Sequence, residues 1–309
     1  MSFPQSARIY EVGPRDGLQN EATPVSTETK LRYISLLAAA GLTEIEATSF
    51  VAPRAIPQLA DADALMPLLP ERGRIRYPVL VPNERGMDRA VAAGADALAV
   101  FTAASDAFTQ SNIGMTIDQS LVAFQPVLHK ATQLGWWTRA YVSTAFGCPF
   151  TGRVEAAKVV DVSLRLLDLG ADEICLGDTI GVGVPAQVHA LTAAVTSAGV
   201  PLDRLAYHFH DTRGTALANV VAGLEDGVTC FDSSTGGTGG CPYAPGAAGN
   251  LATEDLVYML DAMGIEHGVQ LAQVLEAARF IATALGKDLA SKVGQAGGWD
   301  PGTGARMGV

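Results

Sequence analysis

A short unit recurs along this chain: helix-like sequence, then a glycine, then a run rich in Val, Ile, Leu and Ala. It is clear in AAAGLTEIEATSF, AAGADALAVFT, QLGWWTRAYVS and DLGADEICLGD. The glycines of the pattern are Gly41, Gly73, Gly94, Gly135, Gly170, Gly199 and Gly227. Glycine after a helix readily takes the left-handed conformation that closes the last turn. Each of these glycines therefore marks the expected start of a strand.

With the opening strand RIYEVG, the pattern predicts eight strands separated by helices such as 27–40 and 154–169. In the first helix Leu31, Ile34, Leu37 and Ala38 share one face, as in a helix that lies on a sheet. Apolar strands between helices indicate a parallel sheet buried on both faces. Eight such units in about 260 residues match an α/β fold of the (β/α)8 TIM-barrel type. An open doubly wound sheet is the alternative, but the first strand lacks its glycine-rich dinucleotide turn.

The end of the chain differs in character from the repeated units. Helical patterns at 253–263 and 269–286 predict extra C-terminal helices after the barrel. The tail GQAGGWDPGTGARMGV has six glycines in sixteen residues, which favours disorder over 293–309. No boundary is visible before it, so we expect a single catalytic domain over 1–292.

Composition excludes several classes of function. A net charge of −11 and a pI near 4.8 argue against nonspecific nucleic-acid binding, which needs basic surface. No apolar run approaches the roughly 20 residues of a membrane span. The four cysteines form no CxxC pair, and strand-like sequence begins too early for a signal or transit peptide. We therefore expect a cytoplasmic protein without a membrane partner.

Polar residues gather where the predicted strands end, which is where barrel enzymes place their chemistry. These residues are Arg15, Asp16, Gln19, Glu46, Ser49, Arg139, Tyr141, Asp178, His208 and His210. His208 and His210 are two positions apart on a strand, so both rings point to one side. With Asp16 from a nearby strand and a carboxamide oxygen, they would suit Mg²⁺ or Mn²⁺ better than zinc. The alternative is a pair of histidines hydrogen-bonded within a polar rim.

Two further charged positions allow more than one interpretation. Arg15 is either the partner of Asp16 in a surface ion pair or a cation that stabilises an oxyanion above the barrel. Glu46 lies in an apolar strand, where burial is costly unless Arg15 or a metal-bound water pairs with it. Asp178 in LGDTIGVG either caps a helix or binds substrate.

The glycine-rich stretch STGGTGGCPYAPGAAGN, residues 234–250, excludes a regular helix or strand. It holds one thiol, Cys241, and ends in one carboxamide, Asn250. Such a stretch is either an ordinary connector or a functional loop, because loops carry function more often than cores do.

Several long motifs resemble the hydroxymethylglutaryl-CoA lyase family of metal-dependent TIM-barrel lyases. They are VGPRDGLQNE, IEATSFVAPRAIPQLAD, STAFGCPFTG, LGDTIGVG, HFHDTRGTALAN and GGCPYAPGAAGNLATED, and the resemblance runs from about residue 8 to 286. The resemblance implies a divalent cation, Mg²⁺ or Mn²⁺, held by Asp16, His208, His210 and Asn250. It also implies catalytic roles for Arg15, Glu46, His208 and Cys241, with Cys241 as the proton donor of a mobile loop.

The implied reaction is retro-Claisen cleavage of 3-hydroxy-3-methylglutaryl-CoA to acetyl-CoA and acetoacetate, as in leucine degradation and ketone-body formation. Substrate-binding candidates are Arg15, Gln19, Ser49, Asp178 and Asn112, with Arg139 as a further candidate for CoA. The resemblance also implies a homodimer. Alternatives are a lyase for a longer branched 3-hydroxyglutaryl-CoA analogue, an acyl-CoA condensing enzyme, and a non-catalytic acyl-CoA binder. Arg213 departs from the family, which commonly has Tyr after HDT; it lies close in sequence to the two histidines and is a candidate contact for a different acyl group.

Overall fold

Parallel strands form the centre of the computed structural model, which describes residues 3–240, 249–299 and the backbone of 306–307. The strands of the main sheet are β1 (Arg8–Glu11), β2 (Glu44–Ile45), β3 (Thr48–Ser49), β4 (Val79–Leu80), β5 (Ala97–Ala103), β6 (Trp137–Ser143), β7 (Glu173–Asp178), β8 (Leu205–Phe209) and β9 (Cys230–Ser233). Their order is β2-β1-β9-β8-β7-β6-β5-β4-β3. The sheet therefore begins and ends on β2 and β3, which are consecutive along the chain.

The sheet closes into a barrel because β2 and β3 are two halves of one predicted strand. β2 pairs with β1, and β3 pairs with β4. Between them the Glu46 N–H donates to the Glu11 carbonyl, and the Ala47 N–H donates to the Pro78 carbonyl. The Ile45 N–H donates to the Arg76 carbonyl, so the segment over 44–49 bonds to both neighbouring strands and closes the barrel. The eight predicted barrel strands are confirmed.

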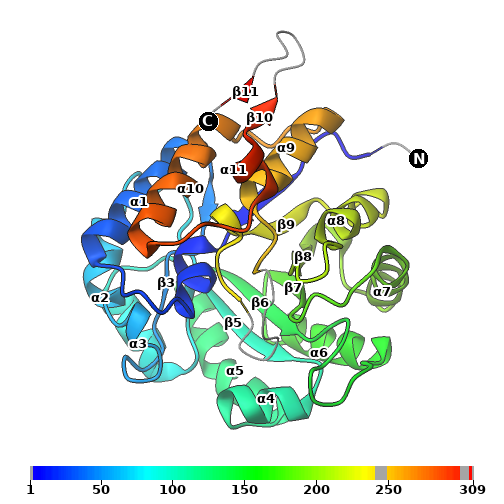
Figure 1. Ribbon diagram of the computed structural model, residues 1–309. Coiled ribbons are helices and arrows are strands. Elements are labelled where there is room, and N and C mark those ends of the chain that lie inside the picture. The colour runs from blue at the N-terminus through cyan, green and yellow to red at the C-terminus, as the bar shows by residue number, and fades with distance from the viewer. Residues whose placement is uncertain (1–2, 241–248, 300–305, 308–309) are drawn as a thin grey trace.

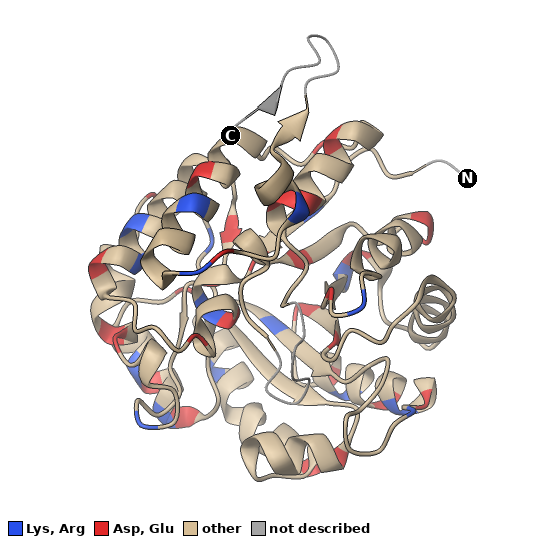
Figure 2. Ribbon diagram, viewed as in Figure 1, with Lys and Arg blue, Asp and Glu red and all other residues tan. Residues whose placement is uncertain are grey.

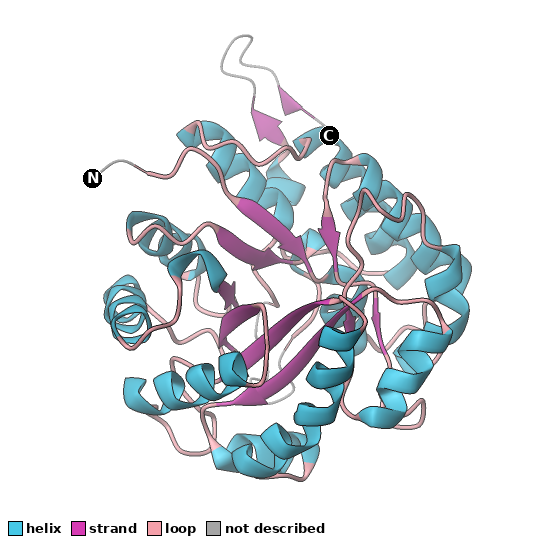
Figure 3. Ribbon diagram, turned by 180° about the vertical axis from the view of Figure 1, so that it is seen from behind, coloured by secondary structure: helices cyan, strands magenta, loops and turns pink. Residues whose placement is uncertain are grey.

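Helices surround the barrel on its outer side, as Figures 1 and 3 show from opposite directions. They are α1 (Thr27–Ala39), α2 (Ala62–Leu65), α3 (Glu84–Ala92), α4 (Asp106–Ile113), α5 (Ile117–Gln133), α6 (Ala156–Asp168), α7 (Pro185–Ser197), α8 (Ala216–Glu225), α9 (Thr253–Met263), α10 (Leu271–Leu285) and α11 (Lys292–Ala296). In α1, Ile34, Leu37 and Ala38 are buried against the sheet, as their spacing predicts. The glycines of the repeated unit all have positive φ, between 70° and 114°. Each glycine ends a helix in the left-handed conformation, and for this reason its position in the sequence marks the strand that follows.

Apolar side chains fill the layer between strands and helices, while the interior of the barrel mixes apolar and charged groups. Tyr10, Ala99, Cys175, Ala206 and Cys230 belong to the apolar part of that interior. Figure 2 shows that most charged positions fall on the helices and loops, with few on the strands. Among the described residues no helix is long and apolar enough to cross a membrane.

Part of the tail lies among the described residues, and the disorder expected over 293–309 stays a prediction. The described part contains α11 and the short antiparallel pair β10 (Gly298–Trp299) and β11 (Arg306–Met307). Asp255 of α9 accepts hydrogen bonds from the Ser291 hydroxyl and from the N–H groups of Lys292 and Val293, at 2.7–3.0 Å. This carboxylate satisfies the free N–H groups at the start of α11, so the helix forms beside a distant element. The single domain over 1–292 stays a prediction.

Candidate metal centre and active site

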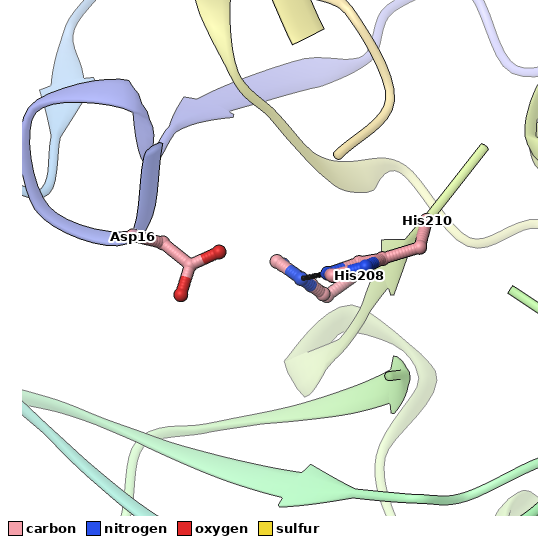
Figure 4. Close-up of side chains that lie close together, drawn as sticks. All are labelled: Asp16, His208 and His210. Atoms are coloured by element: carbon pink, nitrogen blue, oxygen red, sulfur yellow. Dashed lines mark hydrogen bonds between the residues drawn. The ribbon is translucent and has the colours of Figure 1, made fainter. Parts of the chain in front are cut away.

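Three side chains meet where strands β1 and β8 end. Asp16 lies in a π-helical turn, η1 (Gly13–Gly17), that follows β1, while His208 is in β8 and His210 follows that strand. One potential ligand atom of each residue lies within 4.8 Å of those of the other two. Figure 4 shows the carboxylate of Asp16 facing the two imidazoles. Barrel closure therefore brings residues almost two hundred positions apart into one cluster, as the sequence predicts.

Asn250 joins this cluster from the end of the glycine-rich segment. It forms an antiparallel bridge with His210, and its Nδ2 donates to Asp16 Oδ2 and to the Thr238 carbonyl, both at 2.9 Å. Asn250 Oδ1 is buried and has no hydrogen-bond partner among the described residues, and the same holds for His210 Nδ1. A buried acceptor without a donor is unfavourable unless something else fills that role. Carboxylate, amide oxygen and imidazole nitrogen together fit a divalent cation such as Mg²⁺ or Mn²⁺.

Burial and the neighbouring charges keep two of the metal donors, Asp16 and His210, deprotonated. Burial alone would raise the pKa of Asp16, but the positive charge of Arg15 and the two histidines lower it to about 2. Burial and the neighbouring His208 lower the pKa of His210 to about 4. Metal ligands must be deprotonated to bind, so both groups are ready for a cation at neutral pH.

His208 has a different electrostatic environment from His210. Burial lowers its pKa, but the hydrogen bond and charge of Asp232, with a contribution from Asp16, raise it overall. Its Nδ1 lies 3.0 Å from Asp232 Oδ2, and its Nε2 lies 3.1 Å from the Nε2 of His210. A base of this kind, beside a carboxylate and at the edge of a cavity, has the properties of a proton acceptor.

Arg15 connects the metal cluster with the interior of the barrel. Its Nη1 lies 2.8 Å from Asp16 Oδ1, and its Nε lies 2.6 Å from Glu46 Oε1. The hydroxyl of Tyr141 also donates to Glu46, which is fully buried. Burial alone would lower the pKa of Arg15, but the charges of Glu46 and Asp16 raise it above its usual value. The guanidinium is therefore a permanent, positioned cation, and the surface ion-pair alternative does not describe it.

A cavity of about 630 Å³ opens over this cluster. The predicted site residues among its lining are Arg15, Asp16, Gln19, Asn112, His208 and His210. Its apolar wall includes Phe101, Phe108, Ile113, Met115 and Phe124. A concave apolar pocket with a few converging polar groups is the usual form of a small-molecule site.

Two of the predicted substrate-binding residues have other contacts. The Ser49 hydroxyl is buried and bonds to backbone groups of its own strand and the next, outside the cavity lining. Asp178 accepts hydrogen bonds from the N–H groups of Val182 and Gly183, at 2.9 and 2.8 Å. These hydrogen bonds fix the loop that precedes α7. This structural role resembles helix capping, the alternative to substrate binding for Asp178. Substrate binding by Ser49 and Asp178 stays a prediction.

Two arginines considered for ligand contacts lie elsewhere. Arg139 is 0% exposed, inside the barrel between Glu173 and Asp232. The interpretation of Arg139 as a CoA-binding residue was wrong, because a fully buried guanidinium with two carboxylate partners does not reach a ligand at the rim. Arg213 donates to the carbonyls of Ile180 and Gly181, so it joins two rim loops and does not line the cavity.

Sequence reasoning missed three acidic residues that support the site. Asp232 contacts His208, while Glu11 and Glu254 hold the first residues of the glycine-rich stretch. Glu11 accepts from the backbone and hydroxyl of Thr235, and Glu254 accepts from the Gly236 N–H. A carboxylate within an apolar strand was the signal that identified Glu46, and the same signal is present at Asp232 in CFDS. Cys241, the predicted proton donor, lies outside the described residues.

Fold and site together define a class: a (β/α)8 barrel with a candidate divalent-metal centre and a fixed arginine at the carboxyl ends of its strands. Comparison with known proteins agrees with this class. The HMGL-like family model matches residues 6–281. Mitochondrial hydroxymethylglutaryl-CoA lyase of Bos taurus is 50% identical over 295 residues, with 96% of this chain and 90% of the relative covered. The chain therefore belongs to the HMGL-like family.

Two further relatives show how far the likeness extends. The cytoplasmic 3-hydroxy-3-methylglutaryl-CoA lyase of Rattus norvegicus is 48% identical, with 95% of this chain and 85% of the relative covered. The crystal structure of the HMG-CoA lyase of Bacillus subtilis superposes with a TM-score of 0.93 at 45% identity, covering 96% of this chain and 99% of that one. The expected TIM-barrel fold is thereby confirmed over nearly the whole chain.

Proposed function

We propose that this protein is a metal-dependent carbon–carbon lyase that cleaves 3-hydroxy-3-methylglutaryl-CoA to acetyl-CoA and acetoacetate. The observation that carries the proposal is the cluster of Asp16, His208 and His210 beside the fixed cation of Arg15. Its relatives of about 50% identity are named as lyases for this thioester. That identity over 96% of the chain does not favour a condensing enzyme or a lyase for longer substrates.

The donors for the cation are Asp16, His208, His210 and Asn250. A bound Mg²⁺ or Mn²⁺ supplies Lewis-acid chemistry, which makes a substrate hydroxyl easier to deprotonate. The unpartnered Oδ1 of Asn250 is available as an oxygen donor. The hydrogen bond from Asn250 Nδ2 to Asp16 orients the carboxylate before any ligand arrives.

The steps on the substrate use the chain's own residues. His208 accepts the proton of the C3 hydroxyl on Nε2, which is not bound to the cation in this step because a neutral imidazole has a single lone pair. The hydroxyl oxygen becomes the keto group of acetoacetate as the C2–C3 bond breaks. The electron pair of that bond passes to the thioester, and the resulting enolate oxygen is stabilised by Arg15. We assign proton donation to the enolate carbon to Cys241, on the strength of the family resemblance. Glu46 keeps Arg15 in place.

We also propose that the enzyme works as a cytoplasmic homodimer with Mg²⁺ or Mn²⁺. Relatives of similar identity are named both mitochondrial and cytoplasmic, so fractionation of the source cells decides the compartment. The described cysteines, Cys148, Cys175 and Cys230, are free thiols, which suits a reducing compartment. Light scattering on the eluting protein decides the oligomeric state.

A panel of 3-hydroxyacyl-CoA thioesters tests the function and the acyl preference together. The metal-loaded protein is assayed with 3-hydroxy-3-methylglutaryl-CoA and with analogues that carry longer branches at C3. We expect the methyl compound to have the highest kcat/KM and to yield acetyl-CoA and acetoacetate in equal amounts. A longer analogue that reacts faster would reassign the substrate, and no cleavage of any thioester would refute the lyase.

A further inference from the structure

A row of alternating charges starts at the candidate metal centre, crosses the buried interior of the barrel at Asp232, Arg139 and Glu173, and ends at Arg8 and Arg76, whose side chains are 42% and 39% exposed. Successive ion pairs link His208 to Asp232, Asp232 to Arg139, Arg139 to Glu173, Glu173 to Arg8, Arg8 to Glu44, and Glu44 to Arg76. Buried charges of this kind are costly unless each has a partner. The proposed catalytic steps use only the first member, so the rest of the row needs an explanation.

Asp232 is the link between this row and the site. It is 1% exposed, and its two oxygens face different side chains. Oδ1 forms an ion pair with Arg139 Nη2 at 2.6 Å, while Oδ2 lies 3.0 Å from His208 Nδ1 and also accepts from the Cys175 thiol at 3.6 Å. Arg139 is itself held between Asp232 and Glu173, with its guanidinium 3.8 Å from the ring centre of Tyr10. Asp232 and Arg139 are thus both buried and held by charged partners.

These contacts determine which nitrogen of His208 carries the proton. An ionised carboxylate only accepts hydrogen bonds, so the neutral imidazole must place its proton on Nδ1. Nε2 then carries the lone pair, which in the metal-free protein accepts a hydrogen bond from the Nε2–H of His210 at 3.1 Å. A histidine ligand needs this lone pair to bind a metal.

We propose that Asp232 is a positioning residue that holds His208 in the Nδ1–H tautomer, and that Arg139 fixes which carboxylate oxygen does so. The inference rests on the proposed metal-dependent function, to which it adds the residues that prepare one ligand. Of the residues in this row, only His208 is proposed to contact the reacting groups directly.

The substitution Asp232→Asn tests the proposal because a carboxamide has one accepting and one donating end. Arg139 offers only donors, so the amide oxygen turns to Arg139 and the NH₂ group turns to His208 Nδ1. His208 then carries its proton on Nε2, where the lone pair is needed. Changes to the partners of metal-binding histidines weaken metal affinity about 10- to 100-fold, and we expect a loss of that size for Mn²⁺.

The readout is the tautomer itself. The ¹⁵N NMR spectrum of metal-free, histidine-labelled protein at about pH 9, where free imidazole is neutral, distinguishes a protonated from a bare ring nitrogen. We expect Nδ1–H for His208 in the wild type and Nε2–H in Asp232→Asn. The double variant Asp232→Asn with Arg139→Met removes the competing donor, so we expect the wild-type tautomer and much of the Mn²⁺ affinity to return.

The chain offers a matched control. His189 Nδ1 lies 2.9 Å from Asp226 Oδ1 on the surface, so Asp226→Asn alters the same kind of pair away from the site. Calorimetric titration with Mn²⁺ should show unchanged affinity for that variant.

Nε2–H for His208 in the wild type would overturn the proposal, and so would an Asp232→Asn variant with unchanged tautomer and Mn²⁺ affinity. If Asp232→Asn fails to fold, the wild-type spectrum still decides. Neither measurement uses a thioester, so absent lyase activity would refute the proposed function without affecting this result.

Discussion

Arg15 carries the positive charge closest to the candidate metal centre, and its position depends on Glu46. Glu46 is fully buried and holds Arg15 Nε at 2.6 Å, while Asp16 holds Nη1 at 2.8 Å. Breaking a buried ion pair costs more than the pair contributes, because the remaining charge stays out of water. The Arg15–Glu46 pair is therefore a structural requirement of the site as well as part of its chemistry.

The first prediction concerns this pair. Glu46→Ala leaves Arg15 with Asp16 alone, and we expect the free energy of unfolding to fall by about 3–5 kcal/mol, as for other broken buried pairs. Urea unfolding monitored by circular dichroism measures the loss. Asp88→Ala, which breaks the exposed pair with Lys130, is the control, and its effect should be within about 1 kcal/mol. Equal effects of the two substitutions would contradict the account of Glu46.

Glu254 gives a prediction about pH. Burial raises the pKa of this carboxyl from 4.5 to about 8, although the hydrogen bond from the Gly236 N–H lowers it somewhat. The unfolded chain therefore releases this proton at lower pH than the folded protein does. Between about pH 4.5 and 8 the folded state binds more protons, so the contribution of Glu254 to stability falls as pH rises.

In Glu254→Gln this part of the pH dependence disappears, because the carboxamide does not titrate. We expect the variant to match the wild type near pH 5 and to be the more stable of the two near pH 8.5. Urea unfolding in EDTA at both pH values is the measurement, with Glu276→Gln at an exposed position of α10 as the control. If the wild type and Glu254→Gln change in parallel with pH, Glu254 is not protonated in the folded protein.

At the scale of elements, the two ends of the glycine-rich segment come together beside the turn η1. A Cβ on Gly249 would overlap the carbonyl oxygens of Gly237 and Gly239, whereas one on Gly240 would meet no described residue within 4 Å. The close approach sets the position of Asn250, whose side chain reaches Asp16. Only glycine at 249 permits this backbone contact.

Gly249→Ala should therefore displace Asn250 from Asp16. We expect Mn²⁺ affinity to fall about tenfold and kcat by up to about 100-fold, since small misplacements near reacting groups are costly. Calorimetry and steady-state kinetics check these values, and Gly240→Ala should retain wild-type Mn²⁺ affinity. A Gly249→Ala variant with full affinity would show that Asn250 does not depend on this packing.

The sequence predicted those elements whose determining residues lie close together along the chain. Gly170 and Gly199 mark strand starts because a positive φ at each position suits glycine, and the two-residue spacing of His208 and His210 predicts a shared face. The start of α11 was not predictable in the same way, because its capping carboxylate, Asp255, belongs to α9. Nor was the division of the strand over 44–49 into β2 and β3, which depends on closure of the sheet.

At the scale of the whole molecule, the barrel has two kinds of interior. At the carboxyl end of the strands it presents the metal cluster, whose residue types and positions were predictable from the sequence. Deeper in the barrel it holds the charges around Arg139, which the sequence did not reveal. Arg139, Asp232 and Glu173 come from three different strands, and only the folded barrel pairs them. The proposed role of Cys241 depends on resemblance alone.

The most direct test of the central claim is acetoacetate formation from 3-hydroxy-3-methylglutaryl-CoA by protein stripped of metal with EDTA. We expect no product until Mg²⁺ or Mn²⁺ is restored, because Asp16, His208, His210 and Asn250 are proposed to hold the cation that activates the substrate. Asp16→Asn should not recover at the Mn²⁺ concentration that restores the wild type. Full activity of the stripped wild-type protein in EDTA would contradict the metal-dependent lyase proposed for this site.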